Sequence, residues 1–227
     1  MIDTSLHIGQ LTIYSPVTSI TDYLISALTF YFYMRLRRKS NEQEPIINWS
    51  RFFLFMSLST FMGGTAHGFF IFGVGNGFFV SWYIMQILNG ISIYFMQKAT
   101  LSTILKNSVH KEKWRIAYII QLAIFIPSVI FFSNYLVTVI VNAVGFIPVM
   151  ILHYRNKENK SSVMIGHSIA ISFITAFVHL SKISVNDYFN NKDIAHIFIN
   201  ISFIVMFRGI KEEATSSRKL SVLYLSR

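Results

Sequence analysis

Seven apolar stretches, each long enough to cross a bilayer, constrain this chain more than any other feature of its sequence. They run roughly over residues 17–36, 50–73, 78–98, 115–132, 135–153, 162–182 and 194–209. A transmembrane helix needs about 20 mostly apolar residues, and only helices and closed barrels satisfy their backbone hydrogen bonds in lipid. The sequence therefore predicts an all-α integral membrane bundle of seven transmembrane helices.

The composition supports this class. With 53% hydrophobic and 13% charged residues and a mean hydropathy of +0.50, the 227 residues cannot hide their apolar surface in a soluble globule. The chain has no cysteine, which excludes disulfides, thiolate metal sites and cysteine nucleophiles. The first residues lack the basic region of a secretory signal, so we expect the first helix to stay in the membrane.

The basic residues predict the orientation. Of the 20 Lys and Arg residues, 18 follow the first, third, fifth and seventh stretches, which leaves only Lys182 and Lys192 for the opposite side. The positive-inside rule then places the N-terminus outside and the C-terminus in the cytoplasm. Because topology accounts for the formal charge of +10, no nucleic-acid partner is expected.

The expected organisation has three parts. Residues 1–16 form a short extracytoplasmic N-terminal segment, residues 17–210 the seven-helix transmembrane domain and residues 211–227 a basic cytoplasmic tail. We expect a multi-pass protein of the cell membrane, of the bacterial inner-membrane kind. Its expected partners are membrane lipids and a lipid or small-molecule ligand.

The stretch from Phe61 to Phe72 places a histidine beside a run of small residues in an apolar helix. An imidazole in hydrocarbon must find a partner within the protein or line a cavity. The small residues 63–66 allow a neighbouring helix to approach closely. His67 is therefore predicted to face other helices.

Polar residues from several stretches are expected at one depth, because alternate helices descend and rise by about 1.5 Å per residue. Those expected in the outer third of the bundle are Asp22, His67, Trp82, Tyr83, His179, Lys182, Asp187, Asp193 and His196. Taken singly, the charged ones are also compatible with interfacial residues, His67 with a structural histidine, and the aromatic pair with an interfacial belt. For Lys182, at a helix end, snorkelling is a simpler interpretation than a retinal Schiff base.

This layout resembles the superfamily of seven-helix membrane hydrolases that includes alkaline ceramidases and adiponectin-receptor-like proteins. Its members hold zinc through a histidine late in helix two and a His-x-x-x-His pair early in helix seven. His67 matches the first position and His196 the first histidine of the pair, whereas Asn200 stands in place of the second. Gly63 replaces the serine of the family, and no Asp occurs early in the third stretch.

The resemblance implies zinc-dependent hydrolysis of a lipid amide or ester at the outer side. A catalytic zinc needs three protein ligands and an open water position. His179 is the candidate third ligand beside His67 and His196, with Asp22 or Asp193 orienting an imidazole or acting as the base. The candidate ligand-binding residues are Trp82, Tyr83, Lys182 and Asn200.

A second hypothesis is that the protein is not an enzyme. The same polar cluster would then bind a small ligand or protons in a seven-helix carrier, sensor or partner subunit.

Overall fold

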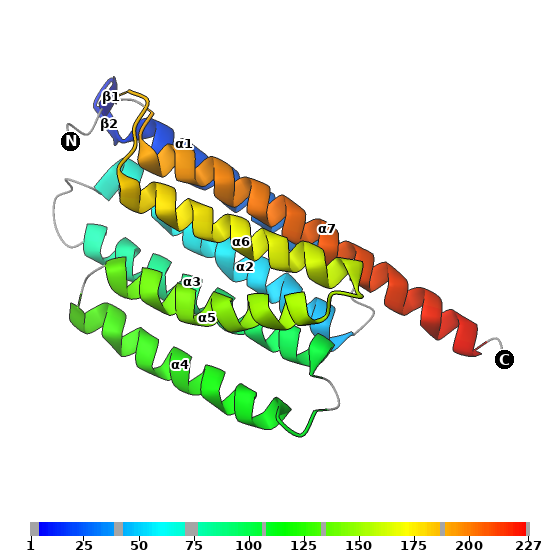
Figure 1. Cartoon of the computed structure of the whole chain (residues 1–227). Helices are drawn as coiled ribbons and strands as arrows, with labels where there is room; N and C mark the ends of the chain where they lie inside the picture. The colour runs from blue at the N-terminus through cyan, green and yellow to red at the C-terminus, as the bar shows by residue number, and fades with distance from the viewer. Residues whose placement is uncertain are drawn as a thin grey trace.

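The computed structural model describes residues 5–38, 43–70, 77–105, 108–132, 135–186 and 189–225. Seven α-helices lie side by side in the described part of the chain, preceded by a two-stranded hairpin (Figure 1). The helices are α1 (Pro16–Arg37), α2 (Glu44–Thr65), α3 (Gly77–Ile104), α4 (Lys111–Phe132), α5 (Tyr135–Arg155), α6 (Lys160–Ser181) and α7 (Asn191–Leu225). The all-α prediction is confirmed.

Several helix ends differ from the prediction, and α2 starts six residues earlier and α3 ends six residues later than expected. α2 is followed by a π-helical turn, η1 (Ala66–Phe70), which contains His67. α7 runs through the expected cytoplasmic tail to Leu225, well beyond the predicted end at residue 209. Residues 210–225 contain no Gly or Pro, so nothing in the local sequence stops the helix where the apolar stretch ends.

The N-terminal hairpin was not predicted. It consists of β1 (Ser5–Ile8) and β2 (Leu11–Tyr14), joined at Gly9, whose φ of 62° suits a tight turn. Apolar and polar residues alternate along both strands, which is the period of a β-strand. The segment is too short for that pattern to stand out beside seven long helices.

Five helices, α3 to α7, are long and apolar enough to cross a membrane, counted over the described residues. The protein is therefore a multi-pass membrane protein. α1 and α2 do not reach the same mean hydropathy. In α1 the cause is a set of polar residues, which are buried in the bundle, whereas many of its apolar residues are exposed and Ile25, Phe32 and Leu36 are buried. The buried polar residues of α1 are Thr18, Ser19, Asp22, Ser26 and Thr29, and its exposed apolar residues include Ile20, Leu24, Phe30 and Tyr31.

Hydroxyl groups and small residues join neighbouring helices. Ser26 of α1 and Ser57 of α2 each donate a hydrogen bond to the other's carbonyl oxygen, at 2.9 and 3.0 Å. Ser202 of α7 likewise donates to the Ser168 carbonyl oxygen of α6 at 2.7 Å. Such bonds are a common way to hold helices together where no hydrophobic effect acts between them.

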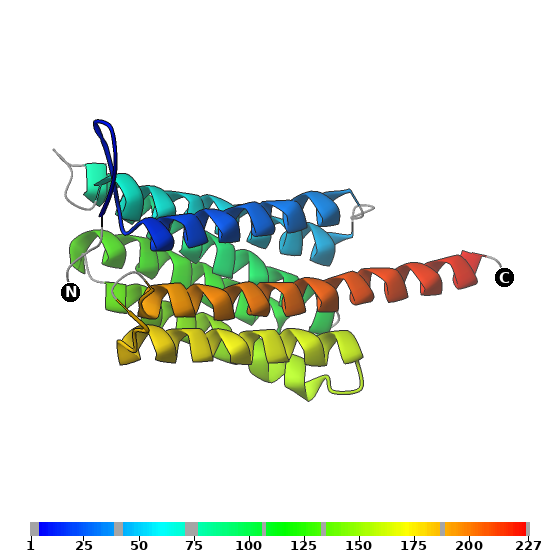
Figure 2. The same cartoon turned by 90° about the horizontal axis from the view of Figure 1, so that it is seen from above.

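An aromatic core closes the half of the bundle away from the hairpin, where α7 lies between α1 and α6 (Figure 2). The rings of Phe32 of α1 and Phe207 of α7 stack at 4.2 Å between centroids, and Phe53 of α2 meets Phe32 edge-on at 5.3 Å. Phe32 and Phe53 belong to one buried cluster with Trp49 and Phe52, and the partly buried Phe207 packs against this cluster. The core thus ties the last helix to the first two.

The small-residue face of α2 lies against α1, as predicted. A Cβ atom at Gly64 would lie 3.0 Å from the Ser19 carbonyl oxygen and 3.2 Å from the Asp22 Cβ. The Ser19 hydroxyl donates to the Gly64 carbonyl oxygen at 2.8 Å, which requires this close approach. α1 is thereby held with Asp22 inside the bundle.

We expect Gly64→Val to destabilise the protein, because overpacking a tight contact costs about 1–3 kcal/mol. The measurement is the free energy of unfolding in mixed micelles. Ala27→Val, which enlarges an exposed position of α1, is the matched control and should stay within about 0.5 kcal/mol of the parent. Equal stability of the two variants would contradict the close packing of α1 on α2.

Candidate functional site

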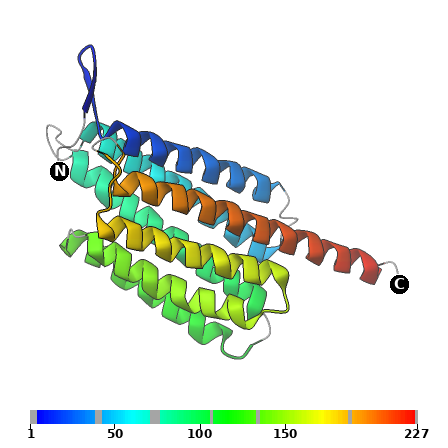
Figure 3. The same ribbon diagram turned by 45° about the horizontal axis from the view of Figure 1, so that its top comes forward.

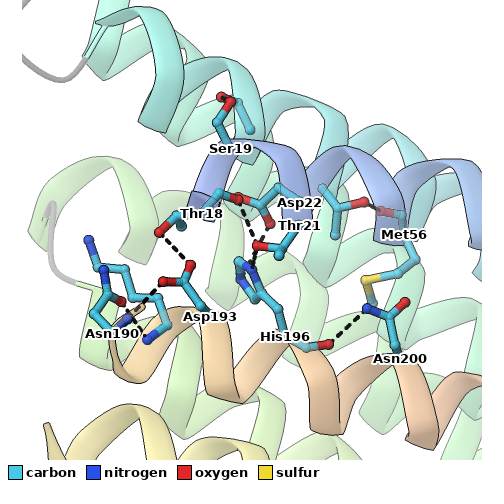
Figure 4. A network of polar contacts seen from close by, with 12 residues as sticks. Thr18, Ser19, Thr21, Asp22, Met56, Asn190, Asp193, His196 and Asn200 are labelled. Atoms are coloured by element: carbon cyan, nitrogen blue, oxygen red, sulfur yellow. Dashed lines mark hydrogen bonds and ion pairs between the residues drawn. The ribbon is translucent and has the colours of Figure 1, made fainter. Parts of the chain in front are cut away.

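A polar cluster lies in the seam between α1 and α7, at the hairpin end of the bundle (Figure 4). The Asp22 carboxylate of α1 is only 6% exposed, and its Oδ1 lies 3.4 Å from Nε2 of His196 on α7. On the other side of the imidazole, Nδ1 lies 2.7 Å from the Thr21 hydroxyl oxygen. Both ring nitrogens of His196 are therefore engaged by α1.

The hydroxyl of Thr21 determines which nitrogen carries hydrogen. Thr21 donates its one hydroxyl hydrogen to the Thr18 carbonyl oxygen at 2.9 Å, so toward His196 it accepts. Nδ1 must then carry a hydrogen, and the neutral ring presents Nε2 as an acceptor. The contact between Nε2 and the Asp22 carboxyl group is attractive only when a proton lies on one of them.

Asp193 binds α1 to the start of α7. Its Oδ1 accepts from the Thr18 hydroxyl at 2.8 Å, and its Oδ2 accepts from the backbone N–H of Asn190 at 2.8 Å. The side chain of Asn190 in turn accepts from the backbone N–H of Lys192. This reciprocal arrangement is a capping box at the N-terminus of α7. The completely buried Asp193, a candidate base in the sequence analysis, thus has both oxygens occupied by a structural role.

His67 lies in η1, with its ring 6.0 Å from that of Trp82 on α3 and at 86° to it. Its Nδ1 is buried and has no hydrogen-bond partner in the part of the chain that the structure describes. The imidazoles of His179 and His196 and the Lys192 ammonium are near enough to act on it electrostatically. The structure thus brings the three predicted histidines to one end of the bundle.

The remaining candidates lie around this cluster. His179 is in the last turn of α6, where its carbonyl oxygen accepts from the Asn191 side chain. Lys182 is exposed at the C-cap of α6, and Tyr83 is half-buried on α3. The Asn200 amide donates to the His196 carbonyl oxygen one turn back along α7. Asp187 lies outside the described residues.

The donor set does not fit zinc as it is arranged. Within the described ranges, no three His, Asp or Glu side chains are grouped as a metal site requires. A histidine binds zinc through a free lone pair on one of its ring nitrogens, whereas both ring nitrogens of His196 contact groups of α1. Binding zinc here would require these contacts to break.

Residues 17–215 match a family of unknown function, DUF6962. The chain belongs to DUF6962. Searches of curated proteins and of solved structures gave no match. The DUF6962 region spans the bundle and the α1–α7 cluster, whereas the hairpin precedes it.

Sequence reasoning missed a second polar set, on α3, α4 and α5. Gln97 donates to Gln121 of α4 at 2.9 Å, and Asn89 donates to Asn142 of α5 at 2.9 Å. Thr138 of α5 donates to Gln86. Gln86, Asn89 and Gln97 lie within one narrow face of α3, and that spacing of amides in an apolar stretch was the available signal.

A buried histidine also lies near the other end of the bundle. His153 of α5 is completely buried, with its ring nitrogens 3.2 Å from the hydroxyls of Thr100 and Ser162. The two hydroxyl groups satisfy the imidazole without any charged partner. Its surroundings suit a structural role, in contrast to His196 with its carboxylate.

We expect Asp193→Ala to destabilise the protein by about 0.5–2 kcal/mol, since it removes the capping box and the acceptor for Thr18. Asp193→Asn should cost less, because an amide oxygen still accepts one of the two bonds. Unfolding free energies of the two variants measure this difference. An unchanged stability in Asp193→Ala would contradict the structural assignment.

Proposed function

We propose that this DUF6962 protein is a non-enzymatic, proton-responsive membrane protein, a sensor or carrier in which Asp22 and His196 share one proton. The observation that carries the proposal is the buried Asp22–His196 contact, with Thr21 orienting the imidazole. Ionisable residues inside a membrane bundle are costly, so a buried carboxylate facing a histidine marks a functional site by default.

The presence or absence of one proton between Asp22 and His196 changes the interaction of α1 with α7. With a proton between Asp22 and His196, the two side chains attract each other and α1 stays against α7. Without it, the carboxylate faces the lone pair of Nε2, and the two repel. The seam between α1 and α7 is the element whose equilibrium the proton shifts.

Other charged groups face the same pair and contribute to its balance. Lys192 and Asp193 come from α7, His179 from α6 and His67 from η1. The Asp193 carboxylate is held by its hydrogen bonds to Thr18 and to the backbone of Asn190, so its distance from the Asp22–His196 pair is fixed.

The proposal includes seven membrane spans with the N-terminus outside, in a cell membrane of the bacterial inner-membrane kind. α1 and α2 are each 22 residues long, the same length as α4 and α6. At about 1.5 Å per residue this is some 33 Å, enough for the hydrocarbon core. The polar residues of α1 lie inside the bundle and many of its apolar residues lie outside. This distribution is expected for a helix surrounded by lipid and not for one surrounded by water.

Reporter fusions at residues 42, 108, 158 and 220 should all report cytoplasm if the chain spans the membrane seven times in this orientation. The readout is the activity of a reporter that works on only one side of the membrane. Extracytoplasmic activity at any two of these positions would exclude the topology.

We expect the parent protein to lose stability as pH rises through the transition of the shared proton, because the bound proton holds α1 to α7. The step should be about 1.5–3 kcal/mol, the range for a hydrogen bond to a charged group. Asp22→Asn and His196→Gln should each remove this step from the profile of unfolding free energy against pH.

The control for this experiment is His110→Gln, which removes an exposed histidine in the loop before α4. It should keep the profile of the parent. If His196→Gln and His110→Gln gave the same profile, the shared proton would be refuted. Stoichiometric zinc in the purified protein, lost in His67→Ala, would instead favour the lipid hydrolase that the resemblance implies.

A further inference from the structure

We propose that the N-terminal hairpin is a lipid-binding element, which lies in the interfacial region of the bilayer with one face inserted among the lipids. The proposal is independent of the shared proton. It rests on the register of the hairpin, on its exposure and on its direction relative to the bundle.

The register gives the hairpin two chemically different faces. Leu6 pairs with Ile13 and Ile8 pairs with Leu11. Directly opposite residues point to the same side of a sheet, and positions two apart share a face, so these four aliphatic side chains form one surface. The other face carries Ser5, His7, Thr12 and Tyr14. His7 and Thr12 bond to each other there at 2.9 Å.

The aliphatic face is not covered by the rest of the protein. Leu6, Ile8 and Leu11 are 48%, 58% and 49% exposed, whereas Ile13, near the base, is half-buried and would lie 3.8 Å from a Cβ atom added at Gly68 of η1. A two-stranded hairpin is marginally stable by itself in water. Something outside the described chain must therefore cover this face.

The direction of the hairpin identifies the bilayer as the cover. It projects sideways from the end of the bundle, across the direction of the helices (Figures 2 and 3). In a membrane it then runs roughly parallel to the surface. The lipid-facing side of α1 begins close by, with Ile20 and Leu24 both more than half exposed. In the proposed topology these α1 side chains face lipid, so lipid at the same end of the bundle is the cover that is available to the aliphatic face of the hairpin.

The lack of formal charge in the hairpin also favours insertion into the interfacial region. Residues 5–14 contain no Lys, Arg, Asp or Glu, so insertion into the interface buries no formal charge. A polar face with a histidine on one side and aliphatic side chains on the other is the pattern of an element that lies in the interface plane. Pairing satisfies the backbone groups that face the other strand, and the groups along the two outer edges need water or lipid headgroups, which the interfacial region supplies.

The absence of cysteine makes a direct test possible, because single cysteines can be labelled with a nitroxide. Ile8→Cys and Leu11→Cys report the aliphatic face, and His7→Cys and Thr12→Cys the polar face. The proteins are placed in phosphatidylcholine nanodiscs. Electron paramagnetic resonance then measures collision of each label with oxygen, which concentrates in lipid, and with a water-soluble nickel chelate.

We expect the oxygen-to-nickel ratio to be high at positions 8 and 11, like that of Leu24→Cys on the lipid-facing side of α1. It should be low at positions 7 and 12, like that of Val109→Cys, which is 86% exposed in the loop before α4. A low ratio at all four hairpin positions would place the hairpin in water and overturn the proposal. Poor access of both reagents at positions 8 and 11, with spin–spin broadening between molecules, would show a second copy as the cover and also overturn it.

Discussion

The contact between α1 and α7 is the interaction on which the rest of this structure depends. Asp22 meets His196, and Thr18 meets Asp193, across 175 residues of chain in the second case. Without these contacts, the buried Asp22 carboxylate and Thr18 hydroxyl of α1 would lose their partners on α7, whereas Ser19 and Ser26 would still bond to α2. The close packing on Gly64 and the aromatic stack of Phe32 on Phe207 hold the two helices at the distance that the polar contacts need.

Three histidines, of which His153 is buried and His67 and His196 are half-buried, show how the surroundings of an imidazole define what it can do. His153 lies between two hydroxyl groups and is satisfied as a neutral ring. His67 lies against Trp82 with a buried nitrogen that makes no hydrogen bond within the described residues. His196 faces a carboxylate on one side and a hydroxyl on the other, so its contacts change with one proton. Only this last arrangement links a protonation state to the packing of two helices.

In a membrane protein the polar face of an amphipathic helix faces the bundle interior and the apolar face faces outward, the opposite of a soluble protein. Polar side chains of α1, and the amides of α3, α4 and α5, lie inside the bundle because lipid offers no hydrogen bonds. An average of hydropathy over both faces of α1 therefore hides the apolar character of its outward face, which carries Ile20, Leu24 and Phe30. The DUF6962 region covers the whole of this polar interior, and the hairpin is added in front of it.

The sequence by itself determined the helices and the membrane class, because periodicity and span length are local properties, and it predicted that Asp22, His67, His179 and His196 lie toward one end of the bundle. It also predicted the small-residue contact of α2. Only the tertiary structure decided the partners: that His196 pairs with Asp22, that Asp193 caps α7, and that Asn200 bonds within its own helix. Depth follows from counting residues along a helix, but the direction of a side chain depends on how each helix is rotated against its neighbours. That rotation is set by packing across the whole bundle, which no single stretch of sequence contains.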